Sequence, residues 1–133
     1  MDGTESANLL DELAATVEAR WQQAGEDREL FFRALRWLQR GDAARAARLF
    51  RRASRHCDEP FATMARMARG RCEVVGGRQG AALRAFEKVA DSDGPPPLRR
   101  MAWMEIADLA RQRQDASLLE RARDALGQLQ VHS

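Results

Sequence analysis

The sequence predicts an all-α fold, and three observations lead to that prediction. Good helix formers, chiefly Ala, Arg, Leu, Glu and Gln, dominate the 133 residues. Strand-favouring residues are scarce, because the chain has no Tyr, a single Ile and only five Val residues. Gly, Pro and Asp residues interrupt the chain at intervals of helical length, and apolar residues recur at i, i+3, i+4 and i+7 between the interruptions. We therefore expect helices packed on one another without a sheet.

Six interruptions separate the predicted helices. Gly25 is the first, and it follows an apolar stripe that consists of Leu10, Leu13, Val17 and Trp21. The other interruptions are Gly41-Asp42, Asp58-Glu59-Pro60, Gly76-Gly77, Asp93-Gly94 with the three prolines that follow, and Gln114-Asp115. Such residues end one helix and cap the next, and the short connections make sequential helices antiparallel. The seven expected helices cover residues 4–24, 27–40, 43–56, 60–75, 79–91, 97–113 and 116–130.

Small and aromatic residues recur in two stretches of the chain with one shared offset of 36 residues. Small residues recur where two helices would cross closely, and Phe recurs where the following helix would fill the gap. A common offset at five positions indicates a repeat rather than chance amphipathicity. The pairs are Ala34 and Gly70, Gly41 and Gly77, Ala46 and Ala82, Phe50 and Phe86, and Ala53 and Val89.

This pattern resembles the tetratricopeptide repeat (TPR), a helix hairpin of about 34 residues with the pattern W-x2-L-G-x2-Y, then G, then A-x3-F-x2-A and P. The second repeat departs from it, since Arg66, Arg69 and Glu73 replace large apolar residues. The third has Trp103, Ile106, Ala107 and Ala110, but Gln114 replaces its glycine. The first repeat has Leu30, Arg33, Ala34, Trp37, Gly41, Ala46, Phe50 and Ala53 at the pattern positions.

The resemblance implies a TPR-like α-solenoid with an extra N-terminal helix. We expect an acidic amphipathic helix in residues 1–25 and a repeat domain in residues 26–133. The expected repeats lie at about 27–58, 60–94 and 97–130.

In proteins of this family the first helix of each repeat lines a concave groove, so the resemblance implies a groove here. Four of the five Met residues fall on it, and Met suits adaptable recognition of an apolar peptide or helix. The alternative is that these Met side chains belong to the core. A carboxylate clamp is not expected, because its positions hold Phe31, Leu35, Ala68, Met101 and Glu105. The implied groove residues are Phe31, Leu35, Leu38, Met64, Met67, Arg71, Met101 and Met104, with Arg71 setting a polar register.

Charge is unevenly spread along the chain, although the formal net charge is only +2. Residues 1–29 have a net charge of −6, whereas residues 30–100 have a net charge of +9. This asymmetry favours contact between the acidic segment and a basic surface, with ordinary solvated helix faces as the alternative. An exposed row of Arg45, Arg48, Arg52 and Arg55 on one helix face could meet phosphates, but no aromatic residue interleaves it, so nucleic-acid binding is the third reading.

Catalytic and metal-binding patterns find little support in the sequence. His56 and Cys57 are adjacent, so their side chains would point in different directions on a helix. The two cysteines form no C-x-x-C pair, and no H-E-x-x-H motif occurs. We expect neither an enzyme nor a cofactor or metal.

The leading expectation is therefore an adaptor or scaffold that binds another protein, and the alternative is a small bacterial chaperone for one client. An Arg-rich composition points to a GC-rich bacterial genome, and an acidic start without a long apolar run points to the cytoplasm. We expect no membrane insertion. The N-terminal helix would cap the repeats, fill the groove, or exchange into a second copy to form a homo-oligomer.

Overall fold

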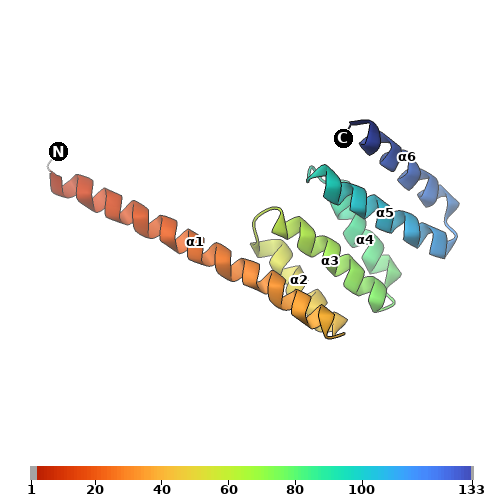
Figure 1. Cartoon of the computed structure of the whole chain (residues 1–133), viewed down its shortest axis with the longest axis horizontal. Helices are drawn as coiled ribbons and strands as arrows, with labels where there is room; N and C mark the ends of the chain where they lie inside the picture. Colours follow the sequence, from red (N-terminus) through yellow and green to blue (C-terminus); the bar gives the residue numbers. More distant parts are fainter. Residues whose placement is uncertain (1–2, 133) are drawn as a thin grey trace.

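The computed structural model describes residues 3–132, and every regular element in that range is an α-helix. The prediction of an all-α fold is confirmed. Five of the helices agree with the predicted ones to within two residues at each end. Figure 1 shows the helices following one another across the molecule in chain order. They are α1 (Gly3–Gln39), α2 (Ala43–His56), α3 (Phe61–Val75), α4 (Gln79–Ala90), α5 (Pro96–Arg113) and α6 (Ala116–His132).

The prediction of two separate helices before residue 41 is wrong, because α1 runs through Gly25 as one helix of 37 residues. A single glycine costs a helix only about 1 kcal/mol relative to alanine, and the residues around it are good helix formers. A side-chain bond from Gln23 Nε2 to Asp27 Oδ1, 3.0 Å long, spans the glycine. The predicted boundary at residue 25 therefore falls inside an element, and residues 1 and 2 of the predicted N-terminal segment lie outside the described residues.

Three turns with the same backbone geometry reverse the chain after α1, α3 and α5. Gly41, Gly77 and Gln114 adopt left-handed conformations with φ of 88°, 75° and 55°. Glycine adopts this conformation freely, whereas the Cβ of Gln114 makes it unfavourable by about 1 kcal/mol. The same pair of backbone hydrogen bonds closes each turn. In the first turn, Gly41 N donates to Leu38 O and Asp42 N donates to Trp37 O. The corresponding bonds run from Gly77 N to Val74 O and from Arg78 N to Glu73 O in the second turn, and from Gln114 N to Arg111 O and from Asp115 N to Ala110 O in the third. Residues 3–132 thus form three helix hairpins, α1–α2, α3–α4 and α5–α6.

The core divides into two clusters that follow the hairpins. The first joins α1, α2 and α3 around Phe31, whose ring lies 5.7 Å from that of Phe50 and 5.6 Å from that of Phe61. The second joins α3 to α6 around Phe86 and Ile106, both with no exposed surface. Small residues fill the crossings, which lets the helices approach closely.

Gly70 marks a close crossing of α3 and α4. A Cβ added at this position would lie 2.5 Å from Cε1 of Phe86, which is a severe overlap. The equivalent pair in the first hairpin, Ala34 and Phe50, is also fully buried. The recurrence of small and aromatic residues at an offset of 36 therefore reflects the same packing inside two consecutive hairpins.

The described odd-numbered helices adjoin through α3, whereas the described even-numbered helices do not contact one another. Each helix packs on the next along the chain, and α3 also contacts α1 and α5. The side of the stack formed by α1, α3 and α5 is therefore continuous, and the other side opens into wedges between α2 and α4 and between α4 and α6. No described helix is both long enough and apolar enough to cross a membrane.

Replacement of Gly70 by alanine should destabilise the protein by about 1–3 kcal/mol, because the new Cβ overlaps a buried ring. Gly25→Ala is the matched control, since nothing lies within 4 Å of a Cβ there. It should raise helicity without lowering the free energy of unfolding. Circular dichroism at 222 nm and urea titration measure both effects, and equal stabilities of the two variants would contradict the close crossing.

Deletion of residues 1–24 should leave the thermal midpoint of the remaining chain unchanged to within a few degrees. The described large apolar side chains of this segment lie outside both core clusters. Helicity should fall in proportion to the residues removed. A large drop in the midpoint, measured by differential scanning calorimetry, would instead indicate that the segment packs on a second copy.

Candidate functional site

Exposed methionines gather on the continuous side of the stack. Met64, Met101 and Met104 are 36%, 51% and 53% exposed. Met101 and Met104 share one side of α5 with Glu105. Met64 shares one side of α3 with Arg71, which follows it by seven residues. An ion pair of 2.8 Å between Arg71 and Glu105 shows that the two sides adjoin. We call this surface the Met face, and its apolar members are Leu35, Leu38, Met64, Val75, Met101 and Met104.

A hollow of about 370 Å³ lies where the three odd-numbered helices meet. Its walls are mostly apolar, and α1, α3 and α5 all contribute to them. Leu38 is half-buried against the first core cluster, and Val75 is 70% exposed at the end of α3. The hollow has the size of a small ligand pocket and could receive one or two apolar side chains of a partner. Leu38, Arg71, Val74, Val75 and Glu105 line it.

Two residues predicted to line the groove lie in the core instead. Phe31 and Met67 are each only 5% exposed. Phe31 packs edge-on against other Phe rings, and Met67 belongs to the cluster around Phe86. Met67 comes three residues after Met64, and this rotation along α3 turns it toward the neighbouring helices. The prediction that four methionines share one exposed surface is therefore wrong for Met67.

Arg71 lies on the Met face, but it already has a partner. Its guanidinium bonds to Glu105 across the junction of α3 and α5, while 65% of its side chain remains exposed. The pair makes the centre of the face electrically neutral. The pair therefore forms a neutral, polar bridge between two apolar areas rather than a free cation.

Phe32 is an apolar surface residue that we did not predict as part of the site. It is 45% exposed, and its ring packs edge-on against Phe31 and Phe61. Adjacent helical residues point about 100° apart, so the burial of Phe31 leaves its neighbour at the surface. The adjacent Phe31 and Phe32 could have predicted this exposed ring, because one core position cannot bury both rings.

The first part of α1 projects away from the stack (Figure 1). We call residues 3–24 the arm. It does not cover the Met face, so the expectations that this segment caps the repeats or fills the groove are wrong for the single chain. Its described large apolar residues are all exposed, by 46% to 77%. They are Leu9, Leu10, Leu13, Val17 and Trp21.

Arg28 anchors α1 to the stack just after the arm. Its guanidinium donates to both carboxylate oxygens of Asp58, the shorter distance being 2.9 Å, and it lies 5.2 Å from the centre of the Phe61 ring. The hydrogen bond from Arg28 lowers the pKa of the Asp58 carboxyl. Cys57 Sγ donates to Asp27 O at 2.9 Å, so α1 and the end of α2 are joined at two points.

Cys57, which follows His56 in the sequence, has its thiol engaged in a contact with α1. Burial raises the pKa of the Cys57 thiol, and that thiol is engaged by a backbone carbonyl. Within residues 3–132, no three His, Cys, Asp or Glu residues are grouped so that they could hold a metal ion.

The arginines of the predicted row lie in different environments. Arg45 pairs with Asp42 at 3.4 Å and lies 4.6 Å from the centre of the Trp37 ring, so it belongs to the turn after α1. Arg48 and Arg52 are exposed on α2. Arg55 lies in a different environment, a hollow between α2 and α4.

Comparisons with known proteins find no protein-family model, no curated protein and no solved structure that matches this chain. The chain is thus characterised by its own geometry, as an all-α stack of three helix hairpins with one apolar face and a projecting helix.

Stability should decrease as the pH rises from 9 to 11, because of Cys72. Burial raises the pKa of this thiol to about 11, so folding favours the neutral form. The favourable contribution is complete below pH 9 and is lost as the pH passes through 11, at a cost of about 2 kcal/mol. The chain has no Tyr to titrate in this range, and Cys57 is the other thiol whose pKa burial raises.

Urea titration at pH 8, 9, 10 and 11 measures this dependence, and Cys72→Ala is the matched variant. Its free energy of unfolding should vary much less with pH. An unchanged slope in the variant would show that another group causes the dependence.

Proposed function

We propose that this chain is a TPR-like adaptor or scaffold that acts in the cytoplasm and has no catalytic role. It binds an apolar peptide or helix of another protein on the Met face. The observation that carries the proposal is the exposure of Met64, Met101 and Met104 beside an apolar hollow. Exposed apolar patches of this kind usually mark interaction sites, and Met adapts its shape to the partner.

The magnitude of the apolar contribution favours reversible binding. Complete burial of an exposed Met or Phe side chain contributes about 1.5–3 kcal/mol, and the methionines of the Met face are already about half buried. A handful of such side chains gives several kcal/mol, from which the cost of association is subtracted. A complex that forms and dissociates readily fits these magnitudes.

The geometry also restricts the form of the partner. Leu38 and Val75 flank the hollow from different helices, and the Arg71–Glu105 pair lies between the hollow and the exposed methionines. An amphipathic helix with apolar residues at i, i+4 and i+7 could place one side chain in the hollow and the others on the methionines. Its polar edge would meet the neutral ion pair.

A client-specific bacterial chaperone is the second candidate, favoured by the arm. The arm and the Met face are two apolar surfaces on one small chain, and together they could enclose an aggregation-prone helix of a client. Co-expression should then keep one specific protein in solution, and this rescue should require both surfaces.

The adaptor proposal is tested with a display library of amphipathic helices that is selected against the immobilised full chain. A selected peptide is then titrated into purified variants. Met101→Glu/Met104→Glu should weaken its binding by at least tenfold, because two charges would enter the apolar contact. Both side chains are about half exposed, so the variant should fold normally.

Leu10→Glu/Leu13→Glu is the matched control, with the same chemical change on the exposed arm. It should bind the peptide as tightly as the unaltered chain. Normal binding by the Met101/Met104 variant, or loss of binding in the arm variant alone, would place the site elsewhere. Met67→Glu is unsuitable, because it would bury a charge in the core.

A further inference from the structure

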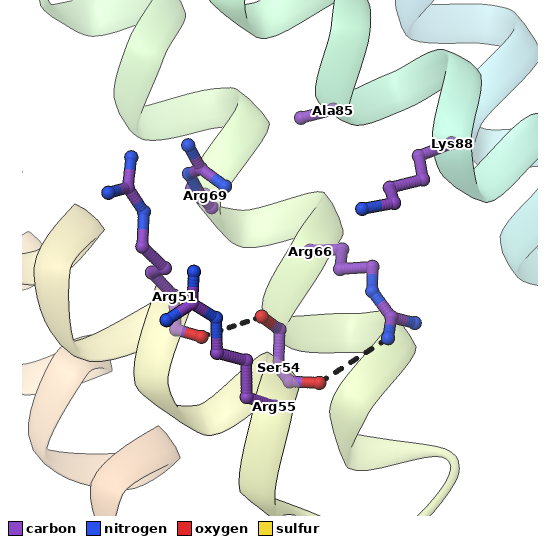
Figure 2. Close-up of a pocket in the computed structure, with 7 residues that line it drawn as sticks. All are labelled: Arg51, Ser54, Arg55, Arg66, Arg69, Ala85 and Lys88. Carbon is purple, nitrogen blue, oxygen red and sulfur yellow. Dashed lines mark hydrogen bonds between the residues drawn. The ribbon is translucent and has the colours of Figure 1, made fainter.

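A basic hollow lies on the other side of the stack, in the wedge between α2 and α4. These two helices do not contact each other, and α3 forms the floor between them. The hollow has a volume of about 290 Å³. In Figure 2, the guanidinium groups of Arg51, Arg55 and Arg69 lie on one side of it, and the amino group of Lys88 points toward them from α4. Arg51, Ser54, Arg55, Arg66, Arg69, Ala85 and Lys88 line the hollow, which we call the basic wedge.

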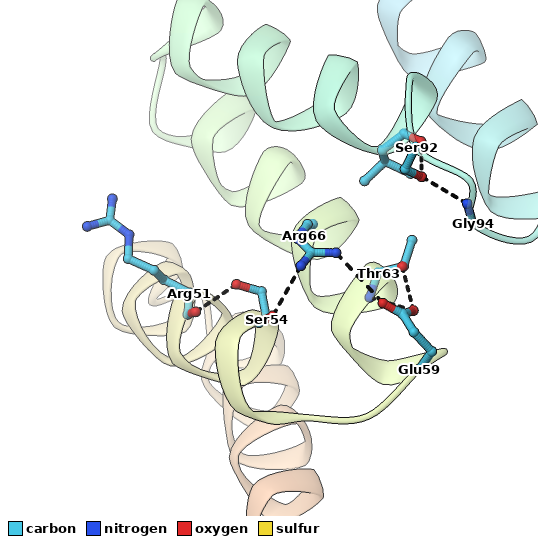
Figure 3. A network of polar contacts seen from close by, with 8 residues as sticks. Arg51, Ser54, Glu59, Thr63, Arg66, Ser92 and Gly94 are labelled. Carbon is cyan, nitrogen blue, oxygen red and sulfur yellow. Dashed lines mark hydrogen bonds and ion pairs between the residues drawn. The ribbon is translucent and has the colours of Figure 1, made fainter.

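Among the described residues, a carboxylate holds only one of the five cations of the basic wedge. Arg66 lies 3.8 Å from Glu59 and donates to Ser54 O at 3.4 Å, and Figure 3 shows this network at the junction of α2 and α3. Glu59 in turn accepts from the backbone and hydroxyl of Thr63, so it is fixed at the start of α3. In the part of the chain that the structure describes, the other four cations form no ion pair.

Arg69 shows the electrostatic consequence. Its pKa is lowered by burial and by the positive charges of Arg51, Arg55 and Arg84. The acidic residue that acts against this effect is Glu73, whose carboxylate is already bonded to Arg78 at 2.5 Å. The basic wedge therefore concentrates positive charge that its own carboxylates do not balance.

The next wedge along the stack shows that packing does not require these arginines. It lies between α4 and α6 over α5, and its lining includes the buried Trp103 and the acidic residues Asp91, Glu120 and Asp124. In the repeat register, Trp103 and Ile106 occupy the positions of Arg66 and Arg69. The same place in the scaffold thus accepts large apolar residues and a mixed set of charges. The excess of cations is particular to the first wedge.

We propose that the basic wedge binds a compact anion that carries two or more phosphoryl groups. Four unpaired cations match this charge, since each phosphoryl group contributes about −1.5 to −2 at neutral pH. Guanidinium groups also bond two phosphate oxygens at once, which suits the three arginines on one side of the hollow. The volume lies at the lower end of ligand pockets, which favours a small anion.

The lining also argues against recognition of nucleic acid. Single-stranded nucleic acid is usually held by aromatic side chains on which bases stack, and the basic wedge contains none. Its cations surround one hollow rather than following an extended track. The ligand is therefore recognised through its phosphoryl groups, and any attached group would project into solvent.

Isothermal titration of the full chain with diphosphate at low ionic strength tests the proposal. One site should be saturated, with an affinity at least tenfold higher than that for orthophosphate. Arg51→Gln/Arg69→Gln should weaken binding by at least tenfold. Arg113→Gln/Arg123→Gln removes the same charge from exposed positions on α5 and α6 and should change the affinity by less than twofold.

A thermal shift measurement distinguishes a loss of diphosphate binding from a loss of folding. Arg51→Gln/Arg69→Gln relieves repulsion, so the free variant should melt no lower than the unaltered chain, yet diphosphate should no longer raise its midpoint. Lys88→Gln, an exposed change on α4, should give a smaller loss of the same kind. A comparison of triphosphate with ATP identifies the source: equal affinities point to free polyphosphate, and higher affinity for ATP points to a nucleotide.

Three results would overturn the proposal. Equal losses in both double variants would show that only net charge matters. Tighter binding of single-stranded RNA than of diphosphate, lost in the same variant, would make the surface a nucleic-acid site. Displacement of diphosphate by a peptide of residues 4–24 would assign the wedge to the acidic arm of a second copy.

Discussion

The structure depends on the reversal of the chain through left-handed turns at Gly41, Gly77 and Gln114. Each turn satisfies the last carbonyls of one helix and fixes the direction of the next, so three hairpins with nearly the same geometry follow one another. Close crossings such as that of Gly70 on Phe86 then set the spacing of the two helices within a hairpin. Neighbouring hairpins adjoin along the odd-numbered helices α1, α3 and α5, and the described helices α2, α4 and α6 are therefore separated from one another.

The two surfaces proposed to bind ligands are opposite consequences of this arrangement. Where the odd-numbered helices touch, side chains between them are buried, and an apolar face with a shallow hollow remains. Where α2 and α4 separate, the floor of α3 is accessible, and polar side chains can occupy positions that would otherwise be core. Arg66 and Arg69 use this opening, whereas Trp103 lines the corresponding one in the next hairpin.

Much of the fold could be predicted from the sequence, because its determinants are local. Caps and breakers gave the bounds of α2 to α6, and the offset of 36 residues located equivalent turns. The break at Gly25 was wrongly predicted, since one glycine costs less than the surrounding helix formers contribute. Exposure on the Met face was harder to predict. Met64 and Met67 differ by less than one helical turn, and only the crossing with neighbouring helices decides which is buried. The arginines of the second repeat departed visibly from the resemblance, but the wedge that they line depends on the separation of α2 and α4.

The continuity of α1 couples the arm mechanically to the stack. A helix rises about 1.5 Å per residue, so the tip of the arm lies about 37 Å along the helix from Arg28, which anchors α1 to Asp58. A tilt of about 10° at that anchor would move the tip by roughly 6 Å, because no loop intervenes to absorb the rotation. Leu35 and Leu38 of the Met face lie on this same continuous helix. A partner that shifts this helix on the face would therefore swing Leu10 and Trp21 through a larger arc, so that contact at one end is transmitted as displacement at the other.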